Sequence, residues 1–258
     1  MLLAIDVGNT NIVIGVFRGE AMVHSWRLTT IRERTSDELG ILITDLCNRN
    51  EVRQSDISGI VIASVVPPLT GTLVAMVGEY FGRVPLLFEP AVNAGIPVLI
   101  DNPSEVGADR VVNSIAAFAT YGRGLPIIVI DFGTATTFDA VSAKGEYLGG
   151  VICPGPQVSA DALVQRTAKL PRIDVRKPAR VIGTNTIGAM QSGLFWGYVD
   201  MVEGLVRRMK AELGGAAVVV ATGGLASIVA PESTSIEHVD DELTLRGLRL
   251  VWERQTTN

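Results

Sequence analysis

The first hydrophobic segments of the chain predict two strands joined by a tight polar turn. Leu2–Ile5 is an apolar run that delivers a carboxylate, Asp6, and Ile12–Phe17 is a second run rich in β-branched residues. Gly8, Asn9, Thr10 and Asn11 lie between the runs and are residue types that favour turns. Because Gly8 has no Cβ, an anion can approach the backbone N–H groups of this turn. A polar hairpin between apolar strands is also a common structural unit, so both readings stay open here.

The rest of the first half alternates between predicted strands and amphipathic helices. His24–Leu28 is a third candidate strand, and Ile57–Val66 is a nearly continuous apolar run, as expected of a strand covered on both faces. Thr35 and Glu38 have the spacing of a capping box and precede apolar residues at helical spacing. A second helix over Leu69–Phe81 and a short strand over Pro85–Phe88 complete this half.

The opening pattern returns near the middle of the chain. When residues 2–17 are set against residues 127–142, Asp6 falls on Asp131, Gly8 on Gly133 and Asn9 on Thr134. The second turn is threonine-rich and is expected to include Thr134, Thr136 and Thr137. Chance repeats seldom agree in strand, carboxylate, glycine and hydroxyl together. The repeat therefore predicts two similar domains that face each other, over residues 1–114 and 115–258, and favours a phosphate-binding role for both turns.

The remainder of the second half predicts three helices and one buried strand. The expected helices cover Ser159–Leu170, Met190–Leu213 and Leu243–Arg254. The strand Ala217–Leu225 ends in Thr222, Gly223 and Gly224, and a glycine pair there allows the flat ring of a nucleoside to lie against the backbone. As an isolated signal this pair is weak.

Composition excludes several classes of function. The 258 residues are 47% apolar and 19% charged, which indicates a globular protein, and the net charge of −5 argues against nucleic acid or an anionic membrane as a partner. Two histidines are too few for a histidine-based zinc site, and two distant cysteines suit a reduced compartment. No apolar segment reaches the length of a membrane-spanning helix, and no leader is visible. We therefore expect a cytoplasmic protein.

A polar segment, residues 101–110, leads into a predicted helix. The hydrophobic period of that helix begins after Arg110, so Asp109 is expected near its first turn, where the helix dipole favours a carboxylate. A capping role alone explains an aspartate at this position. A catalytic role needs further support.

Several segments, in this order, resemble the type III pantothenate kinases of the actin-like ATPase superfamily. They are DVGNTN (6–11), NPSEVGADR (102–110), DFGTATT (131–137), PG…S (154–159), TAKLP (167–171), IGTNT (182–186) and ATGG (221–224). The resemblance spans nearly the whole chain. It implies an α/β fold of two actin-like (ribonuclease H-like) domains, with mixed sheets flanked by helices and the nucleotide in the cleft between the domains. It also implies ATP-dependent phosphorylation of pantothenate to 4′-phosphopantothenate, at the entry to coenzyme A biosynthesis.

The resemblance assigns roles to individual residues. Asp109 is the expected general base for the pantothenate hydroxyl, and Arg110 is expected to pair with the pantothenate carboxylate. The positions that correspond to substrate-binding residues are Ile100, Gly107, Ala108, Asp109, Arg110 and Thr186. The positions expected to bind ATP and its phosphates are Asp6, Gly8, Asn9, Thr10, Asn11, Gly133, Thr134, Gly223 and Gly224.

The resemblance also implies two cations and a second subunit. Mg²⁺ is expected to bridge the ATP phosphates near Asp6 through water, and Asp131 matches the ligand of a monovalent cation, K⁺ or NH₄⁺. Members of the family are homodimers, and the helix that carries Trp196 and Tyr198 is a candidate for the interface.

One position departs from the family pattern. Ile100 stands where a tyrosine usually lines the substrate pocket, which keeps the apolar contact but removes a hydroxyl group. Two alternatives therefore stay open: a kinase of another small alcohol, and a non-catalytic regulator with the same fold. The retained Asp109, Asp131 and both turns favour catalysis.

Overall fold

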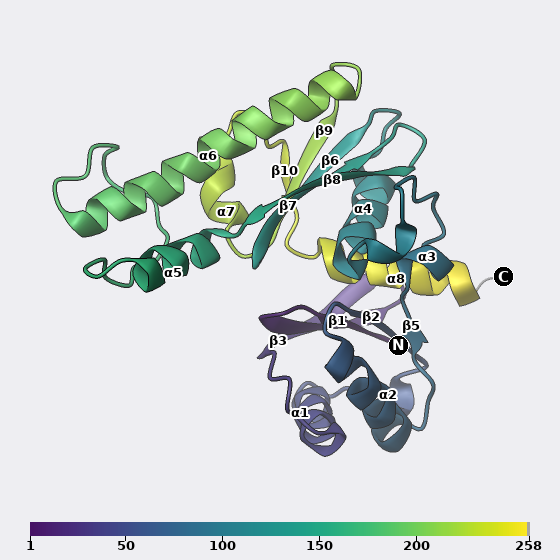
Figure 1. Ribbon diagram of the computed structural model, residues 1–258. Coiled ribbons are helices and arrows are strands. Elements are labelled where there is room, and N and C mark those ends of the chain that lie inside the picture. Colours follow the sequence, from purple (N-terminus) through teal and green to yellow (C-terminus); the bar gives the residue numbers. More distant parts are fainter. Residues whose placement is uncertain (257–258) are drawn as a thin grey trace. The chain divides into compact units, whose positions relative to one another are not determined.

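The computed structural model describes residues 1–256 and divides into two compact units (Figure 1). The first unit contains Met1–Ala116 and the C-terminal segment that begins at Leu243, and the second contains Ala117–Glu242. Helix α4 (Ala108–Tyr121) carries the chain from the first unit into the second. Each unit has its own sheet and its own hydrophobic core.

The sheet of the first unit has the order β3-β2-β1-β4-β5. Its strands are β1 (Leu2–Val7), β2 (Asn11–Arg18), β3 (Ala21–Thr29), β4 (Gly59–Ser64) and β5 (Leu86–Leu87). The pairs β1–β2 and β2–β3 are antiparallel, whereas β4 and β5 run parallel to β1. The predicted order of strands and helices in this half is confirmed.

Helices cover both faces of this sheet because its side chains alternate. Leu3, Ile5 and Val7 belong to a core that is packed under α1 (Ser36–Arg49) and α2 (Pro67–Phe81). On the other face lies α8 (Leu243–Thr256), which contacts β1, β2 and β4 (Figure 1). The α1 capping box is confirmed, because the Glu38 amide donates to Thr35 Oγ1 at 3.2 Å and the Thr35 amide donates to Glu38 Oε2 at 2.8 Å.

The sheet of the second unit repeats this topology, with the order β10-β9-β6-β7-β8. Its strands are β6 (Ile127–Phe132), β7 (Ala135–Val141), β8 (Tyr147–Pro154), β9 (Val218–Thr222) and β10 (His238–Val239). The strands β6, β7 and β8 are antiparallel, and β9 and β10 run parallel to β6. The duplication expected from the two hairpins is therefore present in the strand order and direction of both sheets.

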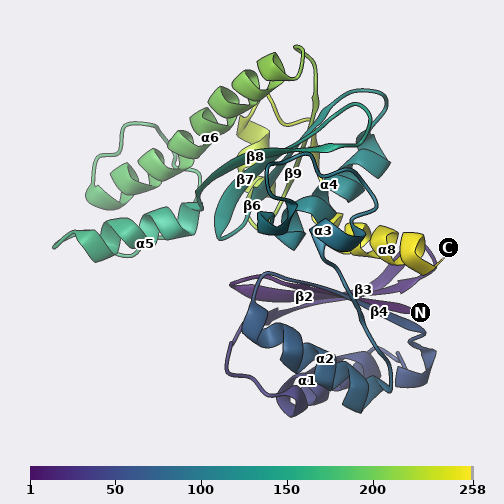
Figure 2. The same ribbon diagram turned by 45° about the vertical axis from the view of Figure 1, so that its right-hand side comes forward.

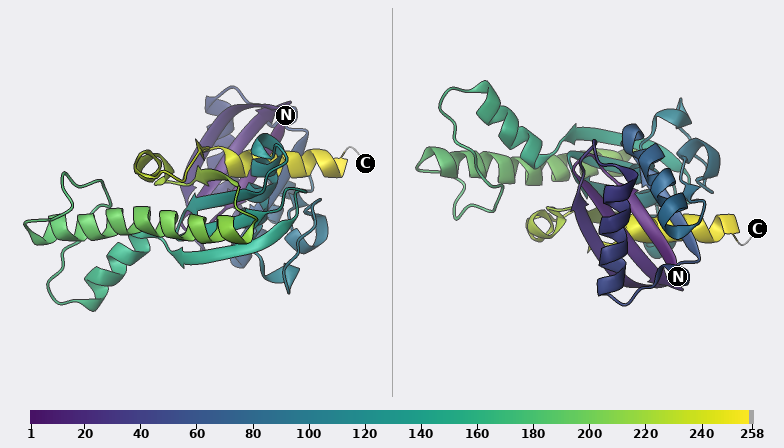
Figure 3. Two further views of the ribbon diagram at one scale, coloured as in Figure 1. Left: turned by 90° about the horizontal axis from the view of Figure 1, so that it is seen from above. Right: turned by 90° about the horizontal axis from the view of Figure 1, so that it is seen from below.

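A long helix, α6 (Thr186–Glu212), dominates the second unit (Figures 2 and 3). From Phe195 onward the helix packs on the sheet, through Phe195, Val199 and Val202. Its N-terminal end extends past the sheet and packs against α5 (Pro156–Arg166), as Figure 1 shows. The helix begins four residues earlier than Met190, because the Asn185 side chain caps it by accepting from the Gly188 amide at 2.8 Å.

Short elements complete the part of the chain that the structure describes. They are α3 (Pro90–Asn93), α7 (Ala226–Val229) and three 3₁₀ turns, Gln54–Asp56, Pro103–Glu105 and Ala230–Glu232. Among the described residues, no helix combines the length and the apolar character that crossing a membrane requires.

Candidate functional site

The first polar turn, Gly8 to Thr10, connects β1 to β2 at the end of the strand that carries Asp6. The Gly8 amide donates to the Asn11 carbonyl at 2.9 Å, which closes the turn, and Asn9 and Thr10 are exposed. A Cβ on Gly8 would lie 3.2 Å from that same carbonyl oxygen, so the turn leaves little room for a side chain. The turn therefore presents backbone and short polar side chains to solvent.

Asp6 lies on a different face of the sheet from the main core of its unit. Its neighbours Ile5 and Val7 are fully buried in that core, whereas Asp6 is half-buried and shares its face with Ala4. The helix α8 covers this face, with Leu245 against Gly15, which pairs with Ala4. The carboxylate thus emerges at the carboxyl end of β1, next to the turn.

The second polar turn is one residue shorter than the first. Only Gly133 and Thr134 lie between β6 and β7, and both are exposed. Thr136 and Thr137 are buried within β7, so the expectation that they belong to the turn is wrong. The two turns therefore correspond residue by residue only as far as Thr134. In the second turn the Gly133 amide donates to the Ala135 carbonyl at 3.1 Å, two residues on, whereas in the first turn the Gly8 amide donates three residues on.

Gly155 packs against the backbone of the second turn. It follows β8, and its amide donates to the Thr134 carbonyl at 3.0 Å. A Cβ at Gly155 would overlap the Thr134 carbonyl oxygen and lie 2.5 Å from the Gly133 carbonyl oxygen. The sequence motif at residues 154–159 marked this segment without showing why it needs a glycine; packing against the turn supplies the reason.

The structure brings Asp131, Gly133 and Gly223 together in the second unit. Asp131 pairs with Thr222 across β6 and β9, so the chain leaves β9 beside this carboxylate. Gly223 has a φ of +90°, and a Cβ there would overlap Asp131 Oδ1. Gly223 is thus required by the carboxylate and by a left-handed backbone. Gly224 is exposed, with open space around it, and is the glycine of the pair that can face a ligand.

Asp109 lies in the first turn of α4, as expected. Its Oδ1 accepts from the Arg110 amide at 2.9 Å, and the side chain is half-buried. Burial raises the pKa of the Asp109 carboxyl above its usual value, although hydrogen bonding and the positive charge of Arg110 act in the opposite direction. A Cβ at Gly107 would lie 2.5 Å from Asp109 Oδ1, so Gly107 gives this carboxylate its space.

The loop before α4 is held by its own polar groups. The Asn102 side chain accepts from Ser104 Oγ at 2.7 Å and donates to Glu105 Oε1 at 2.8 Å. Ile100, which precedes this loop, is half-buried, and Ala108 is buried at the helix start. The expected substrate residues from 100 to 110 therefore lie on one ordered segment of the first unit.

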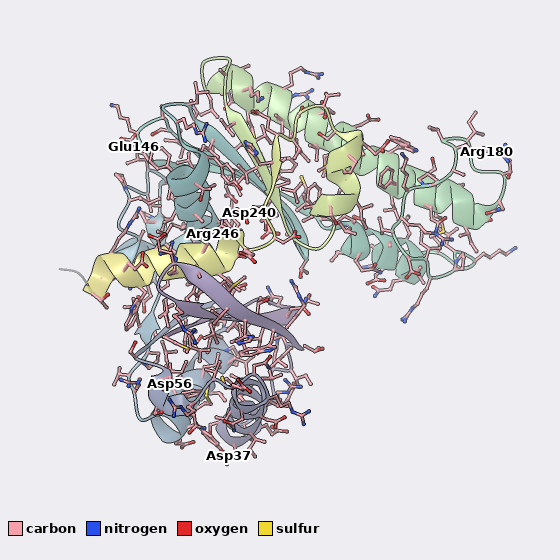
Figure 4. All side chains as sticks on the ribbon, turned by 180° about the vertical axis from the view of Figure 1, so that it is seen from behind. Asp37, Asp56, Glu146, Arg180, Asp240 and Arg246 are labelled. Carbon is pink, nitrogen blue, oxygen red and sulfur yellow. The ribbon has the colours of Figure 1, made fainter. Side chains whose placement is uncertain are left out.

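Thr186 belongs to the second unit and is the first residue of α6. It lines an open cavity of about 630 Å³. The other residues around the cavity are Lys169, Pro171, Arg176, Asn185, Ile187, Gly188 and Gln191. The loop that contains Arg180 lies at this end of α6 (Figure 4). Arg176 borders the cavity, whereas Lys177 pairs with Glu232 at 2.6 Å.

The carboxylates of Asp6 and Asp131 suit cations that are bound jointly by the protein and by the phosphates of a nucleotide. Within residues 1–256, no group of three or more His, Cys, Asp or Glu side chains is arranged to hold a metal ion. Asp6 and Asp131 each offer a carboxylate beside a polar turn. One carboxylate, phosphate oxygens and water are the usual ligands of Mg²⁺ in nucleotide sites, so the residues fit this ion.

Comparison with known proteins identifies the family that this chain is similar to. A sequence model of the family described as "Type III pantothenate kinase" matches residues 2–208. A type III pantothenate kinase from Koribacter versatilis is 53% identical, over 100% of this chain and 97% of the relative. Another from Moorella thermoacetica is 52% identical, over 99% of this chain and 100% of the relative.

A solved structure supports the fold assignment. A protein from Sinorhizobium meliloti described as a 2-dehydro-3-deoxygalactonokinase superposes with a TM-score of 0.61 at 14% identity, covering 99% of each chain. At this identity the likeness concerns the fold alone. Two mixed sheets with one topology and flanking helices are the architecture of the actin-like ATPase and sugar kinase superfamily.

Proposed function

The chain belongs to the type III pantothenate kinase family, and we infer from this premise that it transfers the γ-phosphoryl group of ATP to pantothenate. The product is 4′-phosphopantothenate, and the reaction is the first step of coenzyme A biosynthesis. The observation that carries the inference is identity above 50% over almost the full length of curated relatives. The residue roles below are proposals about how this chain performs the reaction.

The two polar turns are proposed to bind the phosphates of ATP. Gly8, Asn9, Thr10 and Asn11 provide N–H and side-chain donors from the first unit, and Gly133 and Thr134 provide them from the second. Exposure of Asn9, Thr10, Gly133 and Thr134 and the absence of bulky side chains support this role. Phosphoryl transfer depends mainly on aligning the partners and on stabilising charge, which fixed backbone donors do without reorganising.

The exit of β9 is proposed to bind the adenosine. Gly224 leaves open space in front of its backbone, and Gly223 gives the chain the left-handed turn that exposes Gly224. A flat ring can approach a backbone that has no Cβ. Gly223 then contributes to adenosine binding only indirectly, because Asp131 occupies the space where a Cβ on Gly223 would lie.

Asp109 is proposed to be the general base. A carboxylate cannot remove the proton of an alcohol in advance, but it can accept that proton as the bond to phosphorus forms. The raised pKa of Asp109 improves its basicity, and the Arg110 amide holds Oδ1 at 2.9 Å so that the carboxylate has a defined orientation. Arg110 is proposed to pair with the pantothenate carboxylate.

The remaining substrate contacts are proposed from the family resemblance. Gly107 and Ala108 shape the segment before Asp109, and Ile100 provides an apolar contact without the usual tyrosine hydroxyl. Thr186 is proposed to bind pantothenate from the second unit, where it borders the cavity at the start of α6. The missing hydroxyl at position 100 is the one observation that favours another small alcohol as an alternative acceptor.

The family implies ATP with a divalent metal ion, and we propose Mg²⁺ near Asp6 and K⁺ or NH₄⁺ at Asp131. When bound, these cations neutralise charge on the phosphates. Asp6 would hold Mg²⁺ through water, which suits a single half-buried carboxylate at a strand end. Asp131 lies against Gly223 and near Gly133, so a cation there would meet both a carboxylate and backbone groups.

We propose that the protein is cytoplasmic and forms a homodimer. Ile182 is 80% exposed and Val181 63% exposed beside the N-terminus of α6, and adjacent exposed aliphatic side chains are a feature of interaction surfaces. On the helix that is the other candidate for the interface, Tyr198 is buried and donates to the Pro154 carbonyl at 2.6 Å. Sedimentation velocity measures the oligomeric state directly.

A coupled ADP-release assay tests the function. With ATP, Mg²⁺ and pantothenate, turnover is expected only when K⁺ or NH₄⁺ is present, and Na⁺ serves as the control. No turnover with either cation would overturn the pantothenate assignment. Turnover with another small alcohol in the absence of activity on pantothenate would support the alternative acceptor.

A further inference from the structure

Thr30 makes two hydrogen bonds to the first turn, although it is twenty residues away in sequence. It directly follows β3, whose last residue, Thr29, pairs with Asn11. Its hydroxyl donates to the Gly8 carbonyl at 2.7 Å, and its amide donates to the Thr10 carbonyl at 3.0 Å. Thr30 thus contacts both the first and the last residue of the turn, and it is half-buried.

These bonds determine where the turn's own N–H groups point. In a trans peptide the C=O and the N–H of one unit point in opposite directions. The Gly8 carbonyl and the Asn9 N–H share one peptide unit, and the Thr10 carbonyl and the Asn11 N–H share another. Because Thr30 binds both carbonyl oxygens, the N–H groups of Asn9 and Asn11 point away from Thr30. The same contacts engage two carbonyl oxygens, whose partial negative charges would otherwise be free to face an anion at the turn.

We propose that Thr30 is a positioning residue that holds the first turn in its phosphate-binding conformation. The proposal rests on the proposed function, in which this turn binds the phosphates of ATP. A fixed turn is needed because Gly8 lacks a Cβ and its peptide can otherwise rotate readily. Rotation would replace an N–H donor with a carbonyl oxygen that repels phosphate. Thr30 itself makes no contact with the reacting atoms in this account.

The test compares Thr30→Val, which keeps the shape of the side chain, with Thr30→Ser, which keeps the hydroxyl. Loss of one hydrogen bond to the turn is expected to raise the KM for ATP and the Kd for MgATP by about fivefold. The KM for pantothenate should change by less than about twofold, because the turn does not bind the acceptor in this account. Thr30→Ser should restore both ATP constants to near wild-type values.

Thr72→Ala is the matched control. Thr72 is a threonine of the same unit whose hydroxyl also donates to a backbone carbonyl, that of Pro68 at 3.4 Å, but within α2. Thr30→Ala serves as a second variant if Thr30→Val does not fold. The proposal is overturned if Thr30→Val binds MgATP and turns over like Thr72→Ala, or if Thr30→Ser is as impaired as Thr30→Val.

Calorimetric binding of MgATP separates this proposal from the proposed function. If the wild-type protein binds MgATP but does not phosphorylate pantothenate, the assigned reaction fails. Weaker MgATP binding by Thr30→Val would still support the role of Thr30 in that case. If the wild-type protein does not bind MgATP, both proposals are overturned.

Discussion

Asp109 occupies a position where burial and a helix start act on the same carboxylate. Burial raises its pKa, while the Arg110 amide bonded to Oδ1 keeps the charged form accessible. Gly107 leaves the space that this carboxylate occupies. A structural cap needs a hydrogen bond but no raised pKa, so the observed environment favours a role in proton transfer.

Replacing Asp109 by asparagine should remove the base and retain the side chain's shape. We expect kcat to fall by about 10²- to 10⁴-fold, while the Kd for MgATP stays within about twofold. Steady-state kinetics and calorimetry measure the two effects. Asp45→Asn, at an exposed carboxylate on α1 that pairs with Arg49, is the control and should retain full activity. Unchanged turnover in Asp109→Asn would exclude Asp109 as the base.

Gly155 offers a second test at the residue scale. An alanine there must displace the carbonyl oxygens of Gly133 and Thr134, so Gly155→Ala should raise the KM for ATP and destabilise the fold by about 1–3 kcal/mol. Gly193→Ala is the matched control, because nothing surrounds Gly193 on α6, and it should be neutral or stabilising by about 0.5–1 kcal/mol. Equal behaviour of the two variants in urea unfolding and kinetics would contradict the role of Gly155.

A carboxylate on α6 holds the segment that follows α7. Glu203 accepts from Ser233 Oγ at 2.6 Å, Ser235 Oγ at 2.7 Å and Thr234 Oγ1 at 2.8 Å, and also from the amides of Thr234 and Ser235. Burial opposes ionisation, but these hydrogen bonds outweigh it and lower the pKa of Glu203 to about 2. The segment that Glu203 holds is separated from Gly223 and Gly224 by α7 and the turn Ala230–Glu232, so Glu203 fixes the far end of the connection that follows the proposed adenosine site.

This anchor predicts a pH-dependent contribution to stability. A carboxyl whose pKa is lowered from 4.5 in the unfolded chain to about 2 in the folded one stabilises the fold above pH 4.5, and the effect is lost as the pH falls toward 2. Glu203→Gln should therefore lower the free energy of unfolding at pH 7 on the order of 1 kcal/mol, discounted for solvent screening, with a smaller difference at pH 3. Urea titrations at both pH values test this, with Glu212→Gln on the same helix as control. A difference that does not depend on pH would contradict the assignment.

The molecule as a whole consists of two units built on one strand order. Each unit buries its own core and carries one polar turn, with Asp6 and Asp131 at corresponding strand positions. A ligand that binds the folded chain stabilises it by mass action, independently of catalysis. Nucleotide binding can therefore be measured as an increase in the stability of the folded chain.

MgATP should raise the melting temperature of the protein. At a ligand concentration of about 100 times Kd, the stabilisation is about 2.7 kcal/mol. For a chain of this size that corresponds to a shift of roughly 5–10 °C. Scanning fluorimetry measures the shift, with Mg²⁺ alone as control. The absence of any shift at saturating MgATP would contradict nucleotide binding.

Local patterns predicted the order of elements in the first half and the two polar turns, but not the strand β8 in the second half. Alternation and apolar runs predicted the strands, Thr35 and Glu38 predicted the start of α1, and the repeated Asp-x-Gly pattern predicted the duplication. These features can be predicted from the sequence because each strand, cap or turn depends on residues that are close together in the chain. The same local logic misled at Thr136 and Thr137, where hydroxyl side chains resemble turn residues but occupy a buried strand.

Contacts between distant segments decided the remaining features. Thr30 binds the first turn, Gly155 packs on the second, and Gly223 makes room for Asp131. The helix α8 joins the first unit although it ends the chain, with Trp252 against Gly59. Amphipathic periodicity shows that a helix has an apolar face but not which sheet it covers. Hydrophobicity and turn propensity act along the chain, whereas the supports of the two turns exist only once strands and helices have packed, because they consist of atoms brought together by folding.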